Sequence, residues 1–336
     1  MERLNVLIWH IHGSYLNSLA RVNHTWFLPT KPGLPEGYGG RGSTFDLPDN
    51  MVEVPAEHVG DLELDVIVHQ TPKNWTADQY EILSPRQRRL PTVYLEHNTP
   101  KPDAVNMVHP AAEGRSAETL APLLVHVTHF NRLMWDNADL KTEVIEHAVA
   151  IPQDVTYTGE IDAGIVVVNG MEKRPRIAGQ DIFERFRRSI PLQSAGMGTE
   201  RYGGLGDVPY RELHKIVARH RFLFSPMRYT SLPLAVIEAM TLGMPIVALS
   251  TTELPSVLIN GETGFVSNDL KELEHGMNLL MRDPDMARRM GQNARVVASK
   301  RFGLDRFRRD WDRVLSRTAA QSSERPIERK SLALTL

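Results

Sequence analysis

Short apolar runs alternate with helical patterns along the whole chain. Three runs, at residues 4–9, 65–69 and 123–128, have few polar positions, as expected for strands that are buried on both faces. The same patterning predicts further strands at 25–28, 51–54, 92–96 and 143–145, and helices at 76–89 and 129–137. The stretch 29–50 is rich in Gly and Pro and has no period, so we expect a long loop with a functional or mobile character.

The second half of the chain repeats this alternation. It predicts strands at 165–168, 191–195, 222–224, 245–249 and 264–267, and helices at 180–188, 210–220, 232–242, 253–259, 270–281, 284–300 and 304–315. Alternating strands and helices indicate parallel sheets with helices on both faces. The fold class is therefore α/β, with two Rossmann-like doubly wound domains. We expect them at 1–150 and 151–302 with the boundary inside 148–164, followed by a last helical segment (303–318) and a flexible tail (319–336).

Composition narrows the class of protein. The chain has 336 residues, 41% hydrophobic and 24% charged, which suits a globular protein with two cores. Its net charge of -2 provides no basic field for nucleic acid, and the absence of cysteine excludes disulfides and thiol nucleophiles. No apolar run approaches the roughly 20 residues that span a bilayer. We expect a cytoplasmic protein, and the arginine-rich helix at 304–315 leaves open a contact with the inner face of the membrane.

The sequence RYTSLPLAVIEAMTLGMPIVA, at 228–248, carries polar chemistry inside an apolar segment. Thr230 and Ser231 precede the predicted helix and are common N-cap residues. A helix N-terminus also presents unpaired N–H groups that suit a phosphate. Glu238 lies two turns into the helix, where a buried carboxylate needs a partner. It is either a hydrogen-bond acceptor for a vicinal diol such as ribose, or a solvated surface acid.

This segment resembles the signature of the retaining GT-B glycosyltransferases of the large family-4 group, the group 1 glycosyltransferases. The matching residues are Glu-Ala-Met at 238–240, Gly243, Pro-Ile-Val-Ala at 245–248, Glu253, and Asn-Gly-Glu-Thr-Gly-Phe-Val at 260–266. The resemblance is strong over 221–266, weaker from 165 onward and only architectural in the first half. It implies a GT-B fold in which the second domain binds a nucleotide sugar, the first binds the acceptor, and the last helix crosses back onto the first domain.

The resemblance also assigns roles in donor binding. Members of the family have two glutamates eight residues apart, and Glu238 matches the second, which binds the ribose of the nucleotide. The first contacts the donor sugar, and Thr230 stands at its position here. This departure implies a different sugar, deoxygenated or differently oriented. The turn Thr230-Ser231-Leu232 would offer backbone N–H groups to the diphosphate.

A cationic pair follows the first strand of the second domain in this family. Lys173 matches the first cation by its spacing from Gly-Gln-Asp at 179–181, while Ala178 occupies the second slot. Arg174 or Arg176 would then substitute for the missing cation. Charge-assisted bonds from such groups stabilise a departing diphosphate. The alternative is a solvated basic loop.

Two candidates come from the first domain. Gly13, in WHIHGSY, corresponds to the family's glycine-containing loop near the donor phosphate, although the usual double glycine is absent. His97, in LEHNTP, corresponds to a histidine near the transferring sugar. A loop histidine that only makes a structural hydrogen bond is the alternative for His97.

Three motifs are misleading. GYGGRG at 37–42 fits a dinucleotide fingerprint, but no strand directly precedes it and no helix follows. Asp-Pro-Asp at 283–285 resembles a metal-binding triplet, but it begins a helix and suits capping. His126 and His129 have metal-like spacing without a third ligand in view. We expect no metal and no cofactor.

The expected activity is transfer of a sugar from a UDP- or GDP-sugar to an acceptor hydroxyl with retention, by a metal-independent enzyme of the hexosyltransferase type. The expected context is bacterial glycan or glycoconjugate biosynthesis, with a carbohydrate, a lipid-linked molecule or a small molecule as acceptor. One alternative is an epimerase or phosphorylase of the same fold. Another is a nucleotide-sugar-binding scaffold without catalysis, which the threonine at Thr230 favours.

Overall fold

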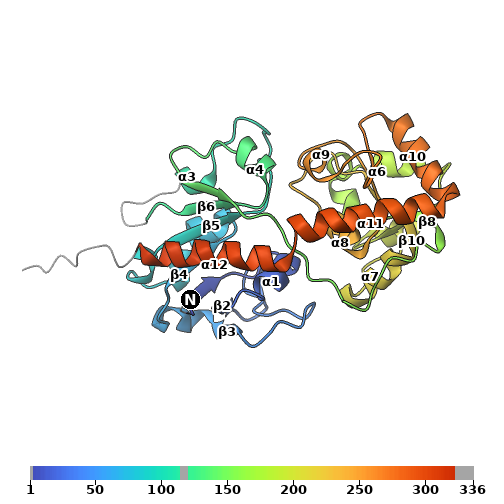
Figure 1. The fold of residues 1–336 in the computed structure, drawn as a ribbon. Coiled ribbons are helices and arrows are strands. Elements are labelled where there is room, and N and C mark those ends of the chain that lie inside the picture. Colours follow the sequence, from blue (N-terminus) through green and yellow to red (C-terminus); the bar gives the residue numbers. More distant parts are fainter. Residues whose placement is uncertain (1–2, 114–119, 322–336) are drawn as a thin grey trace, which may run out of the picture.

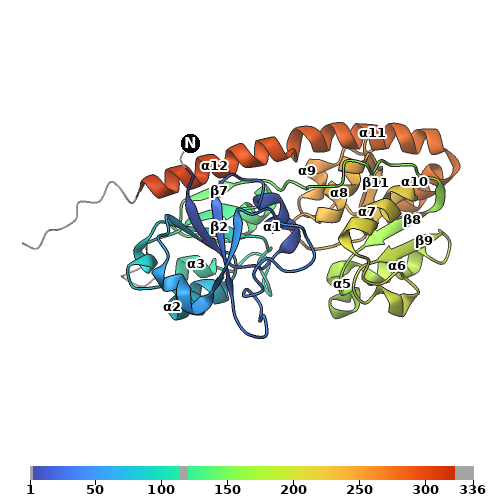
Figure 2. The ribbon, with the colours of Figure 1, turned by 90° about the horizontal axis from the view of Figure 1, so that it is seen from below.

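The computed structural model describes residues 3–113 and 120–321. Two α/β domains lie side by side, and two consecutive helices, α11 (Pro284–Arg301) and α12 (Leu304–Ala320), run along both of them (Figures 1 and 2). Each domain contains one parallel sheet with helices around it, so the predicted doubly wound α/β class is confirmed.

The first sheet has seven strands in the order β3-β2-β1-β4-β5-β6-β7, and every neighbouring pair is parallel. The direction of winding reverses between β1 and β4, which creates a switch point at the carboxyl ends of these strands. The strands are β1 (Asn5–Ile8), β2 (Thr25–Thr30), β3 (Met51–Pro55), β4 (Val66–His69), β5 (Thr92–Glu96), β6 (Leu123–His126) and β7 (Thr142–Val144).

Burial on both faces explains the continuous apolar runs of the first sheet. Val6 and Ile8 belong to the core that α12 covers, and Leu7 belongs to a second core on the opposite face. All three side chains are at most 1% exposed. Phe307 and Trp311 of α12 complete the first core, so the last helix packs on the first domain.

The helices of the first domain differ most from the prediction. They are α1 (Gly13–Leu19), the 3-10 helix η1 (Ala56–Asp61), the π-helix η2 (Asn74–Asp78), α2 (Gln79–Ile82), the 3-10 helix η3 (Gln87–Arg89), α3 (Pro110–Glu113) and α4 (His129–Met134). The continuous helix predicted at 76–89 is wrong, because Leu83 is extended and Pro85 cannot continue a helix. The prediction also missed α1.

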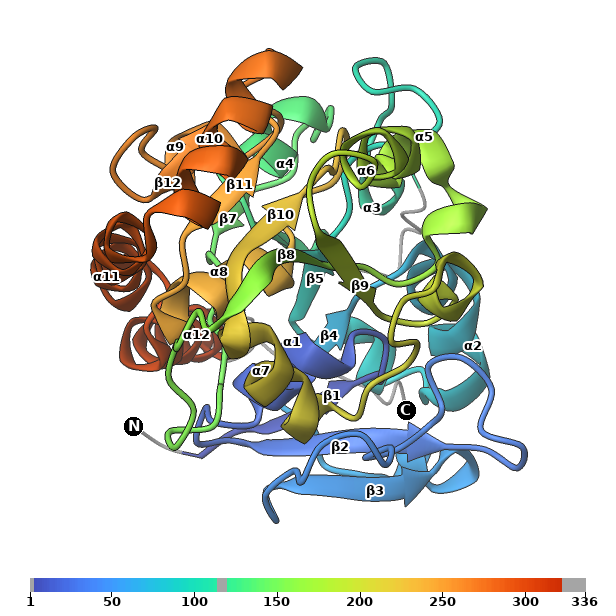
Figure 3. The same cartoon turned by 90° about the vertical axis from the view of Figure 1, so that its right-hand side faces the viewer.

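The second sheet has the order β12-β11-β10-β8-β9, again entirely parallel, with a switch point between β8 and β10. Figure 3 views the molecule from the side of this domain. Its strands are β8 (Ile161–Val167), β9 (Leu192–Ala195), β10 (His220–Ser225), β11 (Ile246–Ala248) and β12 (Gly264–Val266). Because β8 begins at Ile161, it includes residues that the sequence had suggested for the linker.

Helices cover both faces of the second sheet and enclose two apolar cores. They are the 3-10 helix η4 (Met171–Lys173), α5 (Pro175–Ala178), α6 (Gln180–Phe186), the 3-10 helix η5 (Thr199–Tyr202), α7 (Tyr210–Arg219), α8 (Leu234–Leu242), α9 (Leu254–Val257) and α10 (Leu270–Arg282). Asp283 caps α11 by accepting a bond from the Met286 amide at 2.8 Å, so its predicted capping role is confirmed.

Hydrogen bonds and ion pairs centred on Glu253 and Arg301 connect the two domains. Glu253 is 3% exposed and accepts a hydrogen bond from the Phe130 amide of the first domain at 2.8 Å. Arg301, at the end of α11, binds both Glu253 (3.0 Å) and Glu146 of the interdomain linker (2.7 Å). These contacts connect the second domain to the first domain and to the segment between β7 and β8.

Residues 319 and 320 continue α12, and the predicted flexible tail otherwise lies outside the described residues from 322 onward. Within the ranges 3–113 and 120–321, no helix is both long enough and apolar enough to cross a membrane.

Candidate functional site

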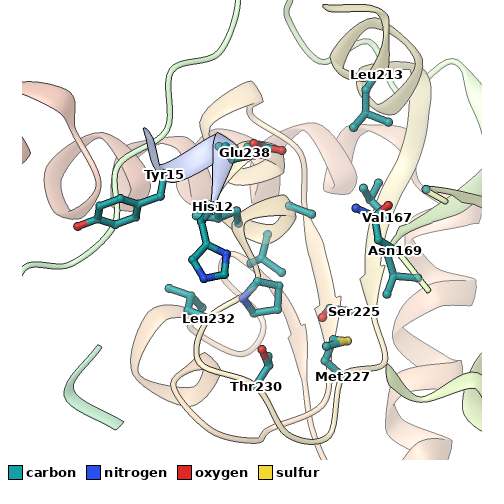
Figure 4. A pocket seen from close by; sticks show the side chains of 18 of the residues that line it. His12, Tyr15, Val167, Asn169, Leu213, Ser225, Met227, Thr230, Leu232 and Glu238 are labelled. Atoms are coloured by element: carbon teal, nitrogen blue, oxygen red, sulfur yellow. The ribbon is translucent and has the colours of Figure 1, made fainter. Parts of the chain in front are cut away.

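A cavity of about 830 Å³ lies between the domains. Its walls come from the segments that follow β1 and β5 in the first domain, and β8, β9 and β10 in the second, together with the first turns of α7 and α8. Both switch points therefore open into the same space, which is where doubly wound sheets bind ligands. Figure 4 shows side chains of both domains around this cavity.

Glu238 lies on the wall contributed by the second domain, on α8, and is 8% exposed. The Tyr210 hydroxyl donates a hydrogen bond to its Oε1 at 3.1 Å, and His214 Nε2 lies 3.5 Å from its Oε2. Burial raises the pKa of Tyr210, and the charge of Glu238 raises it further. Because Glu238 is buried, the alternative of a solvated surface acid is wrong, and Tyr210 is a protein partner of the carboxylate. The carboxylate still lines the cavity and can accept further hydrogen bonds.

The turn before α8 is arranged differently from the prediction. Pro233 is the N-cap residue, no side chain caps the helix, and α8 begins at Leu234. The prediction that Thr230 and Ser231 cap this helix is therefore wrong. Pro233 disfavours helical backbone at the residue before it, so the helix starts later than the sequence pattern suggested.

The same turn nevertheless lines the cavity. Thr230, Ser231 and Leu232 all contribute to its wall. Ser231 is buried, and its Oγ lies 3.4 Å from the Thr128 Oγ1 of the first domain, whereas Thr230 is only half-buried. In Figure 4, Thr230 and Leu232 lie toward one end of the view and Glu238 toward the other. The turn and the carboxylate thus bracket the space in between.

The structure separates the three candidate cations. Arg174 lines the cavity, while Lys173 is exposed at the end of η4 and does not belong to the cavity wall. Arg176 points to Asp181, which it contacts at 2.8 Å, and its side chain is 75% exposed. Arg228 binds the same carboxylate and lowers the pKa of Asp181. Arg174 is therefore the cation placed to meet a ligand.

A cation from the first domain is electrostatically coupled to Arg174. Lys101 follows β5, and its pKa is lowered by partial burial and by the charge of Arg174. The neighbouring Pro100 carbonyl accepts a hydrogen bond from the Tyr229 hydroxyl of the second domain at 3.1 Å. The segment that carries Lys101 thus contacts the second domain through Pro100. Sequence reasoning missed Lys101, although it lies four residues beyond His97.

His97 is buried on the wall contributed by the first domain. Its Nε2 lies 2.9 Å from Gln70 Oε1, and Gln70 donates its own amide N–H to the Trp9 carbonyl at 2.6 Å. The Gln70 oxygen can only accept, so His97 carries its proton on Nε2 and keeps Nδ1 as an acceptor. Burial, reinforced by His12 and His147, holds the pKa of His97 well below its usual value. His97 thus makes the structural hydrogen bond of the alternative and also lines the cavity, while its role near a transferring sugar stays a prediction.

Gly13 also lines the cavity, but it is the first residue of α1 and not part of a loop. A side-chain Cβ at this position would lie 3.1 Å from the Phe45 ring. Phe45 belongs to the long loop at 29–50, which is attached to the end of β1 through a 2.7 Å bond between His10 Nδ1 and the Gly40 carbonyl. The GYGGRG segment is thus part of a braced loop beside the cavity.

No cluster of three or more metal-ligating side chains occurs within the ranges 3–113 and 120–321. His126 and His129, which have metal-like spacing in the sequence, have separate structural roles. His126 Nε2 lies 2.8 Å from Asn137 Oδ1, and His129 is the first residue of α4.

Comparison with known proteins finds a family match within the second domain. Residues 199–297, which include the Glu238 segment, match the family described as glycosyl transferases group 1. The resemblance predicted from the sequence is thereby confirmed over this segment.

Two curated relatives match about a quarter to a third of the chain. An uncharacterized glycosyltransferase of Haemophilus influenzae is 32% identical over 93 residues, which cover 27% of this chain and 26% of the relative. The alpha-D-kanosaminyltransferase of Streptomyces kanamyceticus is 24% identical over 101 residues, or 30% of this chain and 26% of the relative. The matched segment thus spans about a quarter of the length of these relatives.

Solved structures extend the likeness to both domains. Anabaena HepE in complex with UDP-glucose has a TM-score of 0.69 at 16% identity, covering 94% of this chain and 100% of that one. Sucrose-phosphate synthase from Thermosynechococcus elongatus has a TM-score of 0.68 at 13% identity, covering 95% and 100%. These similarities show the GT-B fold over nearly the whole chain.

Further residues of the second domain line the cavity but were not predicted from the sequence: Asn169, Gly196, Met197, Asp207, Val208, Tyr210 and Leu213. They follow β8 and β9, so the switch-point rule indicates their positions, but most are ordinary residue types that carry no signal. Gly196 is informative in the structure, because its φ is +124° and a Cβ there would overlap the Val168 carbonyl. This glycine lets two strand ends approach closely beside the cavity.

Proposed function

We propose that this chain is a glycosyltransferase that moves a sugar from a nucleotide-sugar donor to an acceptor hydroxyl. One observation carries the proposal. Glu238 and Arg174 lie on the same wall of an interdomain cavity, in a domain of the group 1 glycosyltransferases. The carboxylate suits the ribose hydroxyls, and the guanidinium suits the diphosphate.

The donor that we propose is a UDP-sugar, with a GDP-sugar as the alternative to be tested. A neighbouring structure of the same fold, Anabaena HepE, holds UDP-glucose, which supports uridine. Tyr210 donates a single hydrogen bond to the Glu238 carboxylate. The remaining lone pairs of the carboxylate oxygens would accept hydrogen bonds from the ribose hydroxyls. The apolar side chains of Val208 and Leu213, near Tyr210 on the same wall, suit the face of a base.

Positive charge from the protein would stabilise the leaving diphosphate. Arg174 lies on the wall of the cavity, and its charge lowers the pKa of Lys101 of the first domain. Lys173 stands at the exposed end of η4 and Arg176 is engaged with Asp181, so both are assigned weaker roles. The turn containing Thr230, Ser231 and Leu232 would add polar contacts to the sugar and phosphates. In this proposal no metal ion is required for charge neutralisation.

The proposed reaction retains the anomeric configuration. The acceptor oxygen forms a bond to the anomeric carbon on the face from which the diphosphate leaves, while the bond between that carbon and the phosphate oxygen breaks. The acceptor proton passes to the departing phosphate oxygen, so no protein base is needed. His97 has a pKa well below neutral and would act as a hydrogen-bond acceptor for a sugar hydroxyl through Nδ1, not as an acid.

Turnover tests the proposal. The chain is incubated with UDP- and GDP-sugars, with and without neutral and charged acceptors, and both nucleotide release and glycosylated product are measured. Transfer from one nucleotide class, abolished or strongly reduced in Glu238→Ala, is the expected result. Nucleotide-sugar binding without release or transfer would contradict the proposal and favour the binding-scaffold alternative. Interconversion of the donor sugar without transfer would favour an epimerase.

A further inference from the structure

The two walls of the interdomain cavity differ in charge. The wall of the second domain contains Arg174, Asp207 and Glu238. On the opposite wall, none of the described residues that belong to the first domain or the linker is a lysine, arginine, aspartate or glutamate. Its polar groups are imidazoles, hydroxyls and an amide, and its apolar groups include the rings of Tyr15 and Phe45.

The imidazoles of this uncharged wall come from three separate segments that meet at the cavity. The His12 and His97 rings lie 4.2 Å apart between centroids, and Tyr15 contacts both His97 (4.7 Å) and His147 (5.6 Å) edge-on. The Tyr15 hydroxyl is occupied elsewhere, since the Trp311 indole donates to it at 3.0 Å. In Figure 4 the Tyr15 phenol points away from the His12 ring, in agreement with its bond to Trp311 in the core.

Each of these three histidines is neutral near pH 7. Burial lowers the pKa of His12 to about 4 and that of His147 to about 3, and it holds the pKa of His97 well below 6.5. Arg306 lies near His147, but its guanidinium donates to the Glu146 and His147 carbonyls and does not line the cavity. None of the described lysines and arginines of the first domain lines the cavity, so an anion placed against this wall gains no permanent positive charge from it.

Unused hydrogen-bonding capacity remains on the wall. His12 Nε2 is buried and has no hydrogen-bond partner among the described residues. His97 keeps Nδ1 as an acceptor, because its Nε2 is bound to Gln70. Neutral donors and acceptors beside aromatic rings suit the hydroxyls and the C–H faces of a sugar ring. A phosphate or carboxylate would lose its hydration here without gaining a counter-charge, which is unfavourable.

We propose that the part of the acceptor that enters the cavity is an uncharged carbohydrate, held by His12, His97 and the Phe45 ring. Acceptors that carry a phosphate or carboxylate on the reacting sugar are excluded by this wall. The inference rests on the proposed function, because it names the acceptor class for the same site. It narrows the expected acceptors to neutral glycans, small neutral glycosides and the sugar end of lipid-linked molecules.

Matched acceptors test the charge preference. Methyl β-glucoside, glucose 6-phosphate and glucuronic acid, with the galactose and mannose equivalents, are compared at saturating UDP-sugar by product formation. We expect kcat/KM to be at least about tenfold higher for the neutral member of each set, the cost of desolvating an unpaired charge. Equal or faster transfer to the anionic members would overturn the inference while leaving the proposed function intact.

A binding measurement makes the test independent of turnover. Saturation-transfer NMR on the UDP-loaded protein compares the same acceptors, and selective contact with the neutral glycosides is the expected result. If the protein binds a nucleotide sugar but transfers it to none of these acceptors, the proposed function fails. In that case the binding data alone support or overturn the neutral preference.

Variants at one position connect the preference to the wall. Phe45→Lys places a cation there and is expected to raise the relative kcat/KM or binding of the anionic members several-fold. The comparison is made at saturating UDP-sugar, so that a change in nucleotide affinity through the contact of Phe45 with Tyr210 does not enter the ratio. Phe45→Leu is the matched control, in which the neutral preference persists. Both variants are compared with the wild type by thermal melting. An unchanged preference in a folded Phe45→Lys variant would show that this wall does not contact the acceptor.

Discussion

The Tyr210 hydroxyl donates a hydrogen bond to Glu238 Oε1 at 3.1 Å, which connects the first residue of α7 with the middle of α8. The ring of Tyr210 also packs against Phe45 of the first domain, with centroids 4.5 Å apart. A loop on the acceptor side therefore touches the side chain that orients the proposed ribose-binding carboxylate. Tyr210 is in this sense a positioning residue, since it acts on the nucleotide through Glu238.

Removing only the Tyr210 hydroxyl tests this role. In Tyr210→Phe the ring remains but Glu238 loses its donor, which costs roughly 1–2 kcal/mol for a bond to a charged group, or about 5- to 30-fold in Kd. We expect weaker UDP binding in calorimetry, with little change in Tm. Tyr210→Leu, which also loses the contact with Phe45, is the comparison. Wild-type affinity in Tyr210→Phe would show that the bond does not orient Glu238 for binding.

A nucleotide that lacks the ribose diol gives a direct test of Glu238. Glu238→Ala is expected to weaken UDP binding by about 10- to 100-fold, the loss of hydrogen bonds to a charged acceptor. The affinity for 2′,3′-dideoxyuridine diphosphate is expected to be weak in the wild type and nearly unchanged in the variant. Circular dichroism checks that the fold is kept. An equal loss for both ligands would place the effect of Glu238 somewhere other than the ribose.

The cations after β8 offer a matched pair of variants. Arg174 lines the cavity, whereas Arg176 is held by Asp181 at 2.8 Å on an exposed surface. Arg174→Ala is expected to lower kcat by about 100-fold, the scale for one group that stabilises transition-state charge. Arg176→Ala is expected to stay within about threefold of wild type, because exposed ion pairs contribute little. Steady-state kinetics with the preferred donor measures both, and the reverse order would contradict the assignment.

Much of the sheet structure could be predicted because burial on both faces leaves a clear pattern. Val6, Leu7 and Ile8 alternate between two cores, and each face selects an apolar residue. The helix α1 was missed because it begins with Gly13 and buries the polar Asn17 and Ser18, which hides its periodicity. In such segments tertiary packing, not local propensity, decides the structure.

Residues of the candidate site could be predicted from the sequence only where they belong to a recognisable motif. Glu238 belongs to a recognisable segment, but its partner Tyr210 is 28 residues away and has no motif of its own. The capping prediction for Thr230 failed because Pro233 delays the helix. The uncharged wall could not be predicted, since it is formed by segments around residues 12, 97 and 147 that meet only in the fold.

A glutamate introduced at position 230 tests whether this residue determines which donor sugar is used. Thr230→Glu places a carboxylate on the cavity wall, at the position to which the family resemblance assigns the contact with the donor sugar. We expect the ratio of kcat/KM between UDP-glucose and a deoxygenated UDP-sugar to change by at least about tenfold in favour of UDP-glucose. The reason is that the carboxylate accepts a hydrogen bond from a sugar hydroxyl, which the deoxygenated sugar lacks. Thr230→Val, without a hydroxyl or charge, is the control. A uniform change for all donors would mean that Thr230 does not contact the sugar.

The buried histidines predict a loss of stability in acid. His12 and His147 have folded-state pKa values of about 4 and about 3, below the unfolded value of 6.5. The unfolded chain therefore binds protons first as the pH falls, so their contribution is complete above about pH 6.5 and declines below it, with a slope of up to about 1.4 kcal/mol per pH unit for each histidine. Urea unfolding between pH 7 and pH 5 is expected to show this decline.

In His147→Gln the slope is expected to be smaller, though not zero, because burial also lowers the pKa of His69 to about 3. The exposed His275→Gln variant is the control that keeps the wild-type slope, and the same slope in His147→Gln would contradict a neutral, buried His147.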